Sequence, residues 1–221
     1  MLSKEIFEFL NQLKINNNRE WFKQHKAEHD VARKKVIEFS TQLFSTIQQG
    51  NNLDEYKVFR IYRDVRFSKN KTPYKTHFGI GFHRSKPKYR GGYYLHLEPG
   101  NSFLASGFWQ PNKDDLLRVR KEIELDHQHF TKVTTDPKLI KNWNSLAGEQ
   151  LKTAPKGFDK NHPGIKLLRF KQFIYSQKIS DSQLQELDFY MSVKNEFKSI
   201  LPFLDFMGDI LTSDLNGESL I

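Results

Sequence analysis

Cysteine is absent from all 221 residues of the sequence. Its absence excludes disulfide bonds, thiolate nucleophiles and metal sites built on cysteine, and it is compatible with a reducing compartment. Long hydrophobic runs are missing too: no stretch approaches about eighteen uncharged apolar residues, and residues 1–7 lack the apolar core of a signal peptide. We therefore expect a soluble, cytoplasmic protein with no membrane segment.

Internal repeats, low-complexity runs and clear linkers are also lacking. The residues present are sufficient for a large core, since 37% are hydrophobic and 14% are aromatic. We predict one domain over residues 1–221.

Acidic residues are nearly absent from one part of the chain. Between Lys57 and Arg90 there are eleven lysines or arginines and one acid, Asp64, so this window carries a formal charge of +10. The whole chain carries +9, and the remaining 24 bases and 25 acids sum to −1. Because the basicity is concentrated in one window, we expect a negatively charged partner to meet it.

The N-terminal part, about residues 3–48, has helical periodicity. Ser3 is a candidate cap for a short first helix. Asn17, with Glu20 three residues later, is typical of a capping pair that opens a longer helix. The apolar stripe of this longer helix is Trp21, Phe22, His25, Ala32, Val36, Phe39, Leu43 and Ile47.

The middle of the chain, about residues 57–109, changes to short ring-rich or β-branched runs separated by turn residues. We predict four mostly antiparallel strands, at Val58 to Arg63, Phe78 to His83, Tyr93 to Glu98 and Phe103 to Trp109. If the second and third strands pair, a core face carries Phe78, Ile80, Phe82, Tyr93, Leu95 and Leu97. The opposite face then carries His77, Gly79, Gly81, His83, Tyr94, His96 and Glu98, and it could form the floor of a cleft.

The last part, about residues 112–211, is again mainly helical. Asn112 is a candidate cap for one helix, Pro137 to Leu146 is a second, and Lys171 to Gln177 is a further candidate strand. Ser180 with Gln183 is expected to open a last helix on the apolar positions Leu184, Leu187, Met191 and Ile200, with a break at Pro202. Together the elements predict an α+β fold, in which N- and C-terminal helices pack an antiparallel sheet of about four or five strands.

The strongest functional candidate is the segment from Arg60 to Lys75. Forked arginines beside hydroxyl donors and a rigid Pro73 turn are what an ordered anion pocket needs. The predicted ligand-binding residues are Arg60, Arg63, Arg66, Lys71, Tyr74, Lys75 and Tyr94, and Asp64 could orient Arg63 or Arg66. The alternative is a structural or interaction domain in which acids pair with these arginines.

Nucleic acid is a second anion that could meet this window. Tyr62, Phe67, Tyr74 and Tyr89 stand among its cations, and rings stack on bases while cations follow phosphates. No zinc finger, ribonucleoprotein motif or helix-turn-helix is evident. A small phosphate- or carboxylate-bearing ligand is therefore the leading hypothesis, and a non-enzymatic nucleic-acid-binding protein is the alternative.

A second cluster is expected on the open face of the sheet, where His96 and Glu98 point the same way as His77 and His83. Imidazole and carboxylate together suit a divalent metal or acid–base chemistry, but the spacing is diagnostic of neither. We predict no metal and no other cofactor. If the protein catalyses a reaction, the candidate catalytic residues are His96, Asp64 and Tyr74.

The string from Arg63 to Lys75, RDVRFSKNKTPYK, resembles a microbial family called domain of unknown function 2461. The same resemblance extends to Asn17-Asn18, Trp21-Phe22, Gly92 to His96, Gly107 to Pro111, Arg120 and the stretch Pro155 to Leu168. It covers nearly the full chain, supports one domain and implies no settled activity. The family pattern usually has an acid where this chain has Asn70, so the resemblance implies that Asp64 is the only carboxylate of the motif here.

Overall fold

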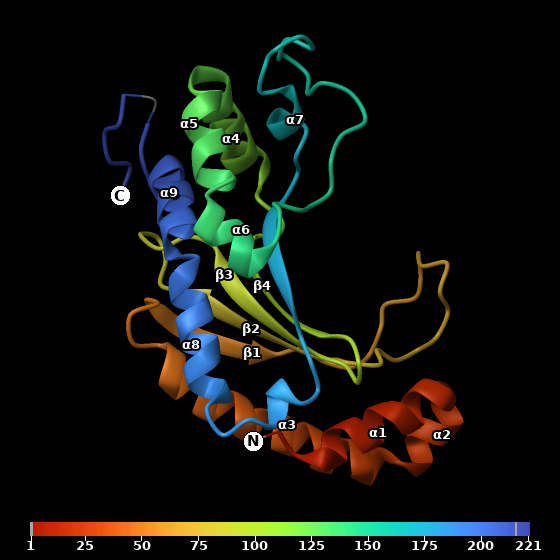
Figure 1. The fold of residues 1–221 in the computed structure, drawn as a ribbon. Coiled ribbons are helices and arrows are strands. Elements are labelled where there is room, and N and C mark those ends of the chain that lie inside the picture. The colour runs from red at the N-terminus through yellow and green to blue at the C-terminus, as the bar shows by residue number, and fades with distance from the viewer. Residues whose placement is uncertain (1, 215) are drawn as a thin grey trace.

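The computed structural model describes residues 2–214 and 216–221 of the chain and consists of helices flanking one antiparallel sheet (Figure 1). The helices before the sheet are α1 (Lys4–Ile15), α2 (Arg19–Gln24) and α3 (Lys26–Ile47). The strands are β1 (Leu53–Val58), β2 (Phe78–Arg84), β3 (Gly92–Leu97), β4 (Ser102–Phe108) and β5 (Phe173–Ile179), in the spatial order β1-β2-β3-β4-β5. The predicted α+β class is confirmed.

The segment between β4 and β5, and the chain after β5, are helical. The former contains α4 (Lys113–Leu125), α5 (His127–Thr134), α6 (Pro137–Trp143) and α7 (Ile165–Leu168), and the latter contains the 3-10 helix η1 (Gln183–Gln185), α8 (Phe189–Ser199) and α9 (Leu201–Thr212). None of the helices in the described part of the chain has the length and apolar character needed to cross a bilayer.

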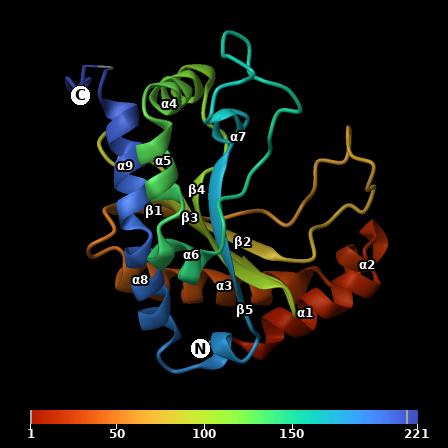
Figure 2. The same ribbon diagram turned by 45° about the horizontal axis from the view of Figure 1, so that its top comes forward.

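One face of the sheet is the core. Phe78 faces Leu97, Ile80 faces Leu95 and Phe82 faces Tyr93 across the β2–β3 pair, and all six side chains are buried as their alternation predicts. Phe197 of α8 stacks on Tyr93, with ring centroids 4.2 Å apart. Phe203 of α9 meets Tyr175 of β5 at 4.9 Å. Helices α3, α6, α8 and α9 therefore cover this face (Figure 2).

The first strand lies earlier in the chain than predicted. It spans Leu53–Val58 and not Val58 to Arg63, because Asn52 turns the chain in the left-handed region directly before it. Beyond Phe59, whose amide donates to the carbonyl of Gly79, the chain leaves the sheet. The ring-rich residues that suggested a strand pair instead within their own loop, where Tyr62 forms a bridge with Tyr74.

Two helix predictions also needed correction. The predicted long helix is divided at His25 into α2 and α3, and its first helix is capped by Asn18, whose side chain accepts from the amide of Trp21, and not by Asn17. After β5, Ser180 and Gln183 do bond reciprocally, but the turn they hold is η1. Helix α8 starts later and in a different register, which leaves Leu187 and Met191 exposed and buries Phe189, Val193 and Phe197.

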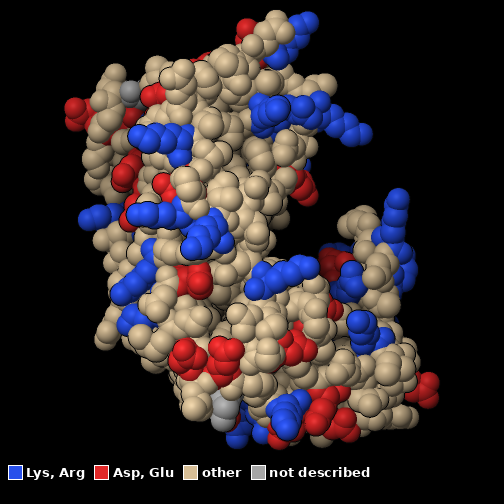
Figure 3. Space-filling model, in the orientation of Figure 1, with Lys and Arg blue, Asp and Glu red and all other residues tan. Residues whose placement is uncertain are grey.

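The second face of the sheet is not covered by helices along its whole length. The β1–β2 connection, residues 59–77, projects beyond the sheet on this side, and the segment 146–171 rises opposite it (Figure 1). The space-filling view shows a hollow between these two parts, with lysine and arginine gathered on both of its rims (Figure 3). A basic concave surface therefore lies over the open face of the sheet.

Candidate functional site

The connection formed by residues 59–77 is an ordered pair of arms. The amide of Arg63 donates to the carbonyl of Pro73 at 2.9 Å, and the amide of Lys75 donates to the carbonyl of Ile61 at 2.8 Å. These bonds lie on either side of the Tyr62–Tyr74 bridge. The base of the arms, which includes Arg63 and Lys75, is therefore held by antiparallel backbone pairing.

The arms are anchored to the N-terminal helices. Tyr74 is buried and stacks on Phe22 with ring centroids 3.9 Å apart, and Ile61 is buried beside it in the core. The Asn17 side chain donates to the carbonyl of Tyr74 at 3.0 Å and accepts from its amide at 3.1 Å. Burial raises the pKa of Tyr74. Tyr74, a predicted ligand and catalytic residue, thus lies in the anchor of the arms.

The cations near the tip of the arms are held by the chain itself. Arg66 donates from Nε and Nη2 to the two carboxylate oxygens of Asp64, at 3.0 and 2.7 Å. The Arg66 hydrogen bonds lower the pKa of Asp64. Lys71 donates to the carbonyl of Val65 at 3.1 Å. Of the two arginines that Asp64 could orient, the structure places it on Arg66, and both side chains are largely exposed.

Three cations nearer the sheet have a different environment. Among residues 2–214 and 216–221, no carboxylate forms an ion pair with Arg60, Arg63 or Lys75, and Arg63 donates instead to the hydroxyl of Thr72 at 3.1 Å. Burial lowers the pKa of Lys75, and the neighbouring charges of Arg60 and Arg63 lower it further. We call Arg60, Arg63 and Lys75 the basic cluster. Asp64 acts on Arg60 only through space, without an ion pair, and the three cations lower one another's proton affinity, as the pKa of Lys75 shows.

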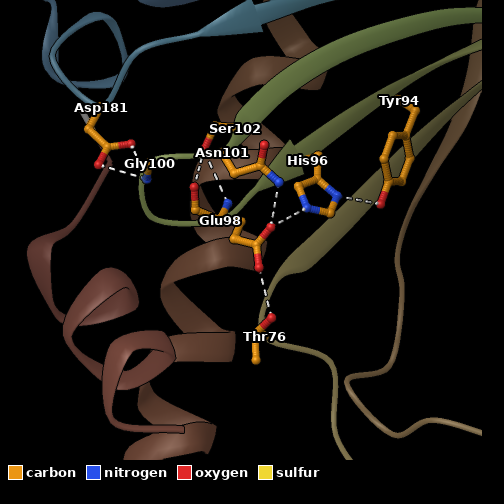
Figure 4. Close-up of polar contacts among 8 residues, drawn as sticks. All are labelled: Thr76, Tyr94, His96, Glu98, Gly100, Asn101, Ser102 and Asp181. Carbon is orange, nitrogen blue, oxygen red and sulfur yellow. Dashed lines mark hydrogen bonds and ion pairs between the residues drawn. The ribbon is translucent and has the colours of Figure 1, made fainter. Parts of the chain in front are cut away.

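Beside the basic cluster lies a hydrogen-bonded chain on β3, shown in Figure 4. The hydroxyl of Tyr94 is 3.2 Å from Nδ1 of His96, and Nε2 of His96 is 3.4 Å from a carboxylate oxygen of Glu98. Thr76 and Asn101 donate to Glu98 at 2.7 and 2.8 Å. Residues 94, 96 and 98 alternate along an extended strand, so all three side chains lie on the open face, as the sequence predicts.

The pKa shifts indicate the protonation states of the hydrogen-bonded residues Tyr94, His96 and Glu98. Burial alone would raise the pKa of Glu98, but the bonds from Asn101, Thr76 and His96 outweigh it and lower the pKa. Burial lowers the pKa of His96 against the opposing effect of Glu98, and burial raises the pKa of Tyr94 to about 12. At neutral pH Glu98 is therefore ionised and His96 neutral. The neutral His96 ring donates a hydrogen bond from Nε2 to Glu98 and accepts a hydrogen bond from the Tyr94 hydroxyl at Nδ1.

His77 connects this chain to the basic cluster. Its ring lies 4.0 Å from that of His96, centroid to centroid. Burial, together with the charges of His96, Lys75 and Arg63 and against the opposing charge of Glu98, lowers the pKa of His77 to about 4. Throughout the part of the chain that the structure describes, no group of three or more histidine or acidic side chains has an arrangement that would hold a metal ion.

A pocket of about 490 Å³ opens next to Tyr94. Its walls include the half-buried rings of Phe59, Tyr94 and Trp109, and its floor is formed in part by Gly81, Gly92 and Gly107 of three adjacent strands. Phe59 and Trp109 were not predicted as site residues. Alternation along β2 indicated Gly81 of the floor. Phe59 and Trp109 fall inside strands that the sequence predicts, but faces were assigned only to the second and third strands, so neither ring was placed on the open face.

Two arginines in the outer part of the basic window, Arg84 and Arg90, form ion pairs with acids of α9 and α4. The buried side chain of Arg84 pairs with Asp205 of α9 and donates to the carbonyl of Arg90. Arg90 pairs with Asp115 at one end of the pocket. Lys86 and Lys88 are exposed. Charge density along the sequence did not separate these structural arginines from the basic cluster.

Most of the sequence matches a protein family. The match is to a conserved hypothetical protein family, DUF2461, and covers residues 5–206. No curated protein and no solved structure matches the chain. Segments that carry this likeness meet in space: Asn17 and Phe22 hold Tyr74, and residues 92–94 and 107–111 line the pocket.

Proposed function

This chain belongs to the DUF2461 family, whose description assigns no activity, and we propose from its geometry that it binds a small anionic ligand on the open face of the sheet. The observation that carries the proposal is the basic cluster. Arg60, Arg63 and Lys75 lie close enough to depress the pKa of Lys75, and no described acid pairs with them. A bound phosphate or carboxylate would relieve this repulsion and accept charge-assisted hydrogen bonds.

The ordering of the arms supports the same proposal. Fixing long cationic side chains in a neighbourhood of like charge costs free energy, and the anchor through Asn17 and Phe22 offsets that cost before a ligand arrives. Such a preorganised cation group binds an anion with less loss of conformational entropy than a flexible basic tail. We place this activity in the cytoplasm.

Proton transfer is the chemistry that the neighbouring residues would add if the ligand is turned over. With His96 neutral at Nδ1 and Glu98 ionised, His96 can take the Tyr94 proton in the same step in which the Tyr94 oxygen accepts a proton from a ligand hydroxyl, while Glu98 stabilises the imidazolium. The raised pKa of Tyr94 requires the two transfers to occur together, so that no free tyrosinate forms. Of the predicted catalytic candidates, His96 has this role, whereas Asp64 orients Arg66 and Tyr74 anchors the arms.

Titration calorimetry with inorganic phosphate, ribose 5-phosphate and succinate tests the binding proposal. We expect at least one of them to bind, and Arg63→Ala to weaken it by about tenfold or more, because a hydrogen bond to a charged group contributes about 1.5–3 kcal/mol. Arg66→Ala should cost less than about threefold, since Asp64 already occupies that guanidinium.

Lys34→Ala is the matched control. It removes the same unit of charge from an exposed position of α3, which covers the opposite face of the sheet. The Lys34→Ala variant should bind the same ligand with the affinity of the wild type. Absence of binding for every ligand in the panel, or unchanged affinity in Arg63→Ala, would contradict the proposal.

A further inference from the structure

We propose that the ligand of this site carries a flat conjugated ring as well as an anionic group, and that the ring binds in the pocket of Phe59, Tyr94 and Trp109. This inference rests on the proposed anion site and assigns the chemical class of its ligand. The class is a ring joined to a phosphate or carboxylate by a spacer of about the length of a sugar, as in a nucleoside monophosphate.

The pocket has the size and lining of a small-molecule site. Its volume of about 490 Å³ lies within the roughly 300–1,000 Å³ of ligand pockets. Tyr94 meets Phe59 at 6.2 Å and Trp109 at 6.4 Å between ring centroids, in tilted and edge-on geometries. These are favourable separations for aromatic groups, so a further ring entering the pocket would extend an existing cluster.

The glycines of the floor set how closely its neighbours pack. A Cβ atom added to Gly81 would lie 3.3 Å from the ring of Phe59. A Cβ atom added to Gly107, where φ is +138°, would lie 2.1 Å from the carbonyl oxygen of Phe173. Gly81 therefore lets the Phe59 wall of the pocket lie directly against the strand, and Gly107 lets the backbone of β5 approach β4 closely.

The pocket and the basic cluster are neighbours on the open face, although the three cations do not line the pocket themselves. Phe59 is a wall of the pocket and Arg60 is the next residue of the chain. On the other side, the Tyr94 hydroxyl contacts His96, and the His96 ring packs on His77, which lies in the field of Lys75 and Arg63. His77 and Gly81 are four residues apart on an extended segment, which separates their Cα atoms by about 13 Å. The long side chains of the basic cluster can cover part of this distance toward the pocket.

The polarity of the site fixes the orientation of the ligand. At the far end of the pocket Arg90 is paired with Asp115, which leaves Lys86 as a single exposed cation there. The basic cluster has three cations, and within residues 2–214 and 216–221 none of them forms an ion pair with a carboxylate. The anionic group therefore lies toward the basic cluster and the ring toward Trp109.

Calorimetry with three matched probes tests the inference: AMP has both ring and anion, ribose 5-phosphate has the anion alone, and adenosine has the ring alone. We expect AMP to bind at least tenfold more tightly than either fragment. Trp109→Ala should remove this advantage and leave ribose 5-phosphate unaffected, whereas Trp109→Phe should retain most of it. Arg63→Ala should weaken AMP and ribose 5-phosphate alike.

The outcomes separate the two proposals. Equal affinity for AMP and ribose 5-phosphate in the wild type would overturn the ring site while leaving anion binding intact. Absence of binding by all three probes, with inorganic phosphate and succinate also inactive, would overturn both. Loss of AMP affinity in Lys86→Ala but not in Arg63→Ala would overturn the proposed orientation. Tighter binding of a single-stranded oligonucleotide than of AMP would replace the small ligand with nucleic acid.

Discussion

Tyr94 occupies its position because the residue beneath it has no side chain. A Cβ atom at Gly79 would lie 2.4 Å from the Tyr94 hydroxyl oxygen, far inside van der Waals contact. The hydroxyl can therefore reach His96 only over a glycine. The chain from Tyr94 through His96 to Glu98 depends on this single residue of the neighbouring strand as much as on its own members.

Gly79→Ala should displace the Tyr94 hydroxyl and break its bond to His96 without unfolding the protein, because the clash is with the end of a movable side chain. We expect a stability loss of about 1–3 kcal/mol. The ¹⁵N chemical shift of His96 Nδ1 should move toward that of a nitrogen without a donor. Gly81→Ala is the control, since its Cβ atom would meet the ring of Phe59 at 3.3 Å and Nε2 of His83 at 3.5 Å, and not Tyr94. An unchanged His96 signal in Gly79→Ala would show that the bond does not form in solution.

His77 should make the stability of the protein depend on pH in the acid range. Its folded pKa is lowered to about 4 by burial, so the unfolded chain takes up a proton near pH 6.5 while the folded chain does not. The contribution of His77 is fully present above about pH 6.5 and is lost as pH falls to about 4. Between these pH values we expect the free energy of unfolding of His77→Asn to change by about 1–3 kcal/mol less than that of the wild type, allowing for solvent screening. Urea denaturation at several pH values measures it.

The control for this pH dependence is His129→Asn, at an exposed position of α5. Its denaturation curves should keep the acid-range slope of the wild type. If His77→Asn keeps that slope as well, His77 is protonated normally in the folded protein.

At the scale of elements, the projecting arms depend on the N-terminal helices. Asn17→Ala would remove both hydrogen bonds that its side chain makes to the backbone of Tyr74. We expect a stability loss of about 1–3 kcal/mol, because buried backbone groups lose their partner. Hydrogen exchange should accelerate at the amides of Arg63 and Lys75. Ligand affinity should also fall, although Asn17 lies in the anchor of the arms and is not one of the proposed ligand-binding residues.

Asn11→Ala provides the comparison, since Asn11 is an exposed residue in the middle of α1. It should leave exchange at Arg63 and Lys75 unchanged. Equal exchange in Asn17→Ala and Asn11→Ala would mean that the arms hold together without their anchor.

Elements with a regular period were predictable from the sequence, and their partners across long separations were not. The alternation of Phe78, Ile80 and Phe82 identified both faces of β2. In contrast, Asn17 was taken for a helix cap because its spacing to Glu20 fits one, whereas Asn18 is the cap and Asn17 bonds to Tyr74. A local pattern cannot reveal that a polar side chain is used 57 residues away.

The candidate site was predictable only in part for the same reason. Local charge density placed Arg60, Arg63, Arg66 and Lys75 in one group, but only folding separates Arg66, held by Asp64, from the other three. Tyr94 and His96 were found because strand alternation fixes their side. Phe59 and Trp109 become neighbours of Tyr94 only when β1, β3 and β4 are assembled in the sheet.

At the scale of the whole molecule, the basic segments far apart in the chain border one hollow. Residues 59–77 form one rim, and the opposite rim, residues 146–171, contains Lys152, Lys156 and Lys160 (Figure 3). The field in this hollow should attract anions from solution, while the negatively charged remainder of the chain contributes little. A small ligand that meets only the basic cluster and a polynucleotide that follows both rims would respond differently to salt.

Salt dependence therefore distinguishes the two kinds of ligand. Between 50 and 500 mM salt, AMP affinity should fall by roughly threefold to tenfold, because only the basic cluster contacts its phosphate. The affinity of an oligonucleotide lying along both rims would fall more than about a hundredfold, since each phosphate contact releases a counterion.

Replacing Arg60, Arg63 and Lys75 by alanine lowers the net charge from +9 to +6 and should abolish the salt dependence for AMP. Replacing the exposed Lys4, Lys14 and Lys34 gives the same net charge of +6 and should preserve it. If both triple variants lose AMP affinity equally, the attraction comes from the overall charge of the protein and not from the cluster.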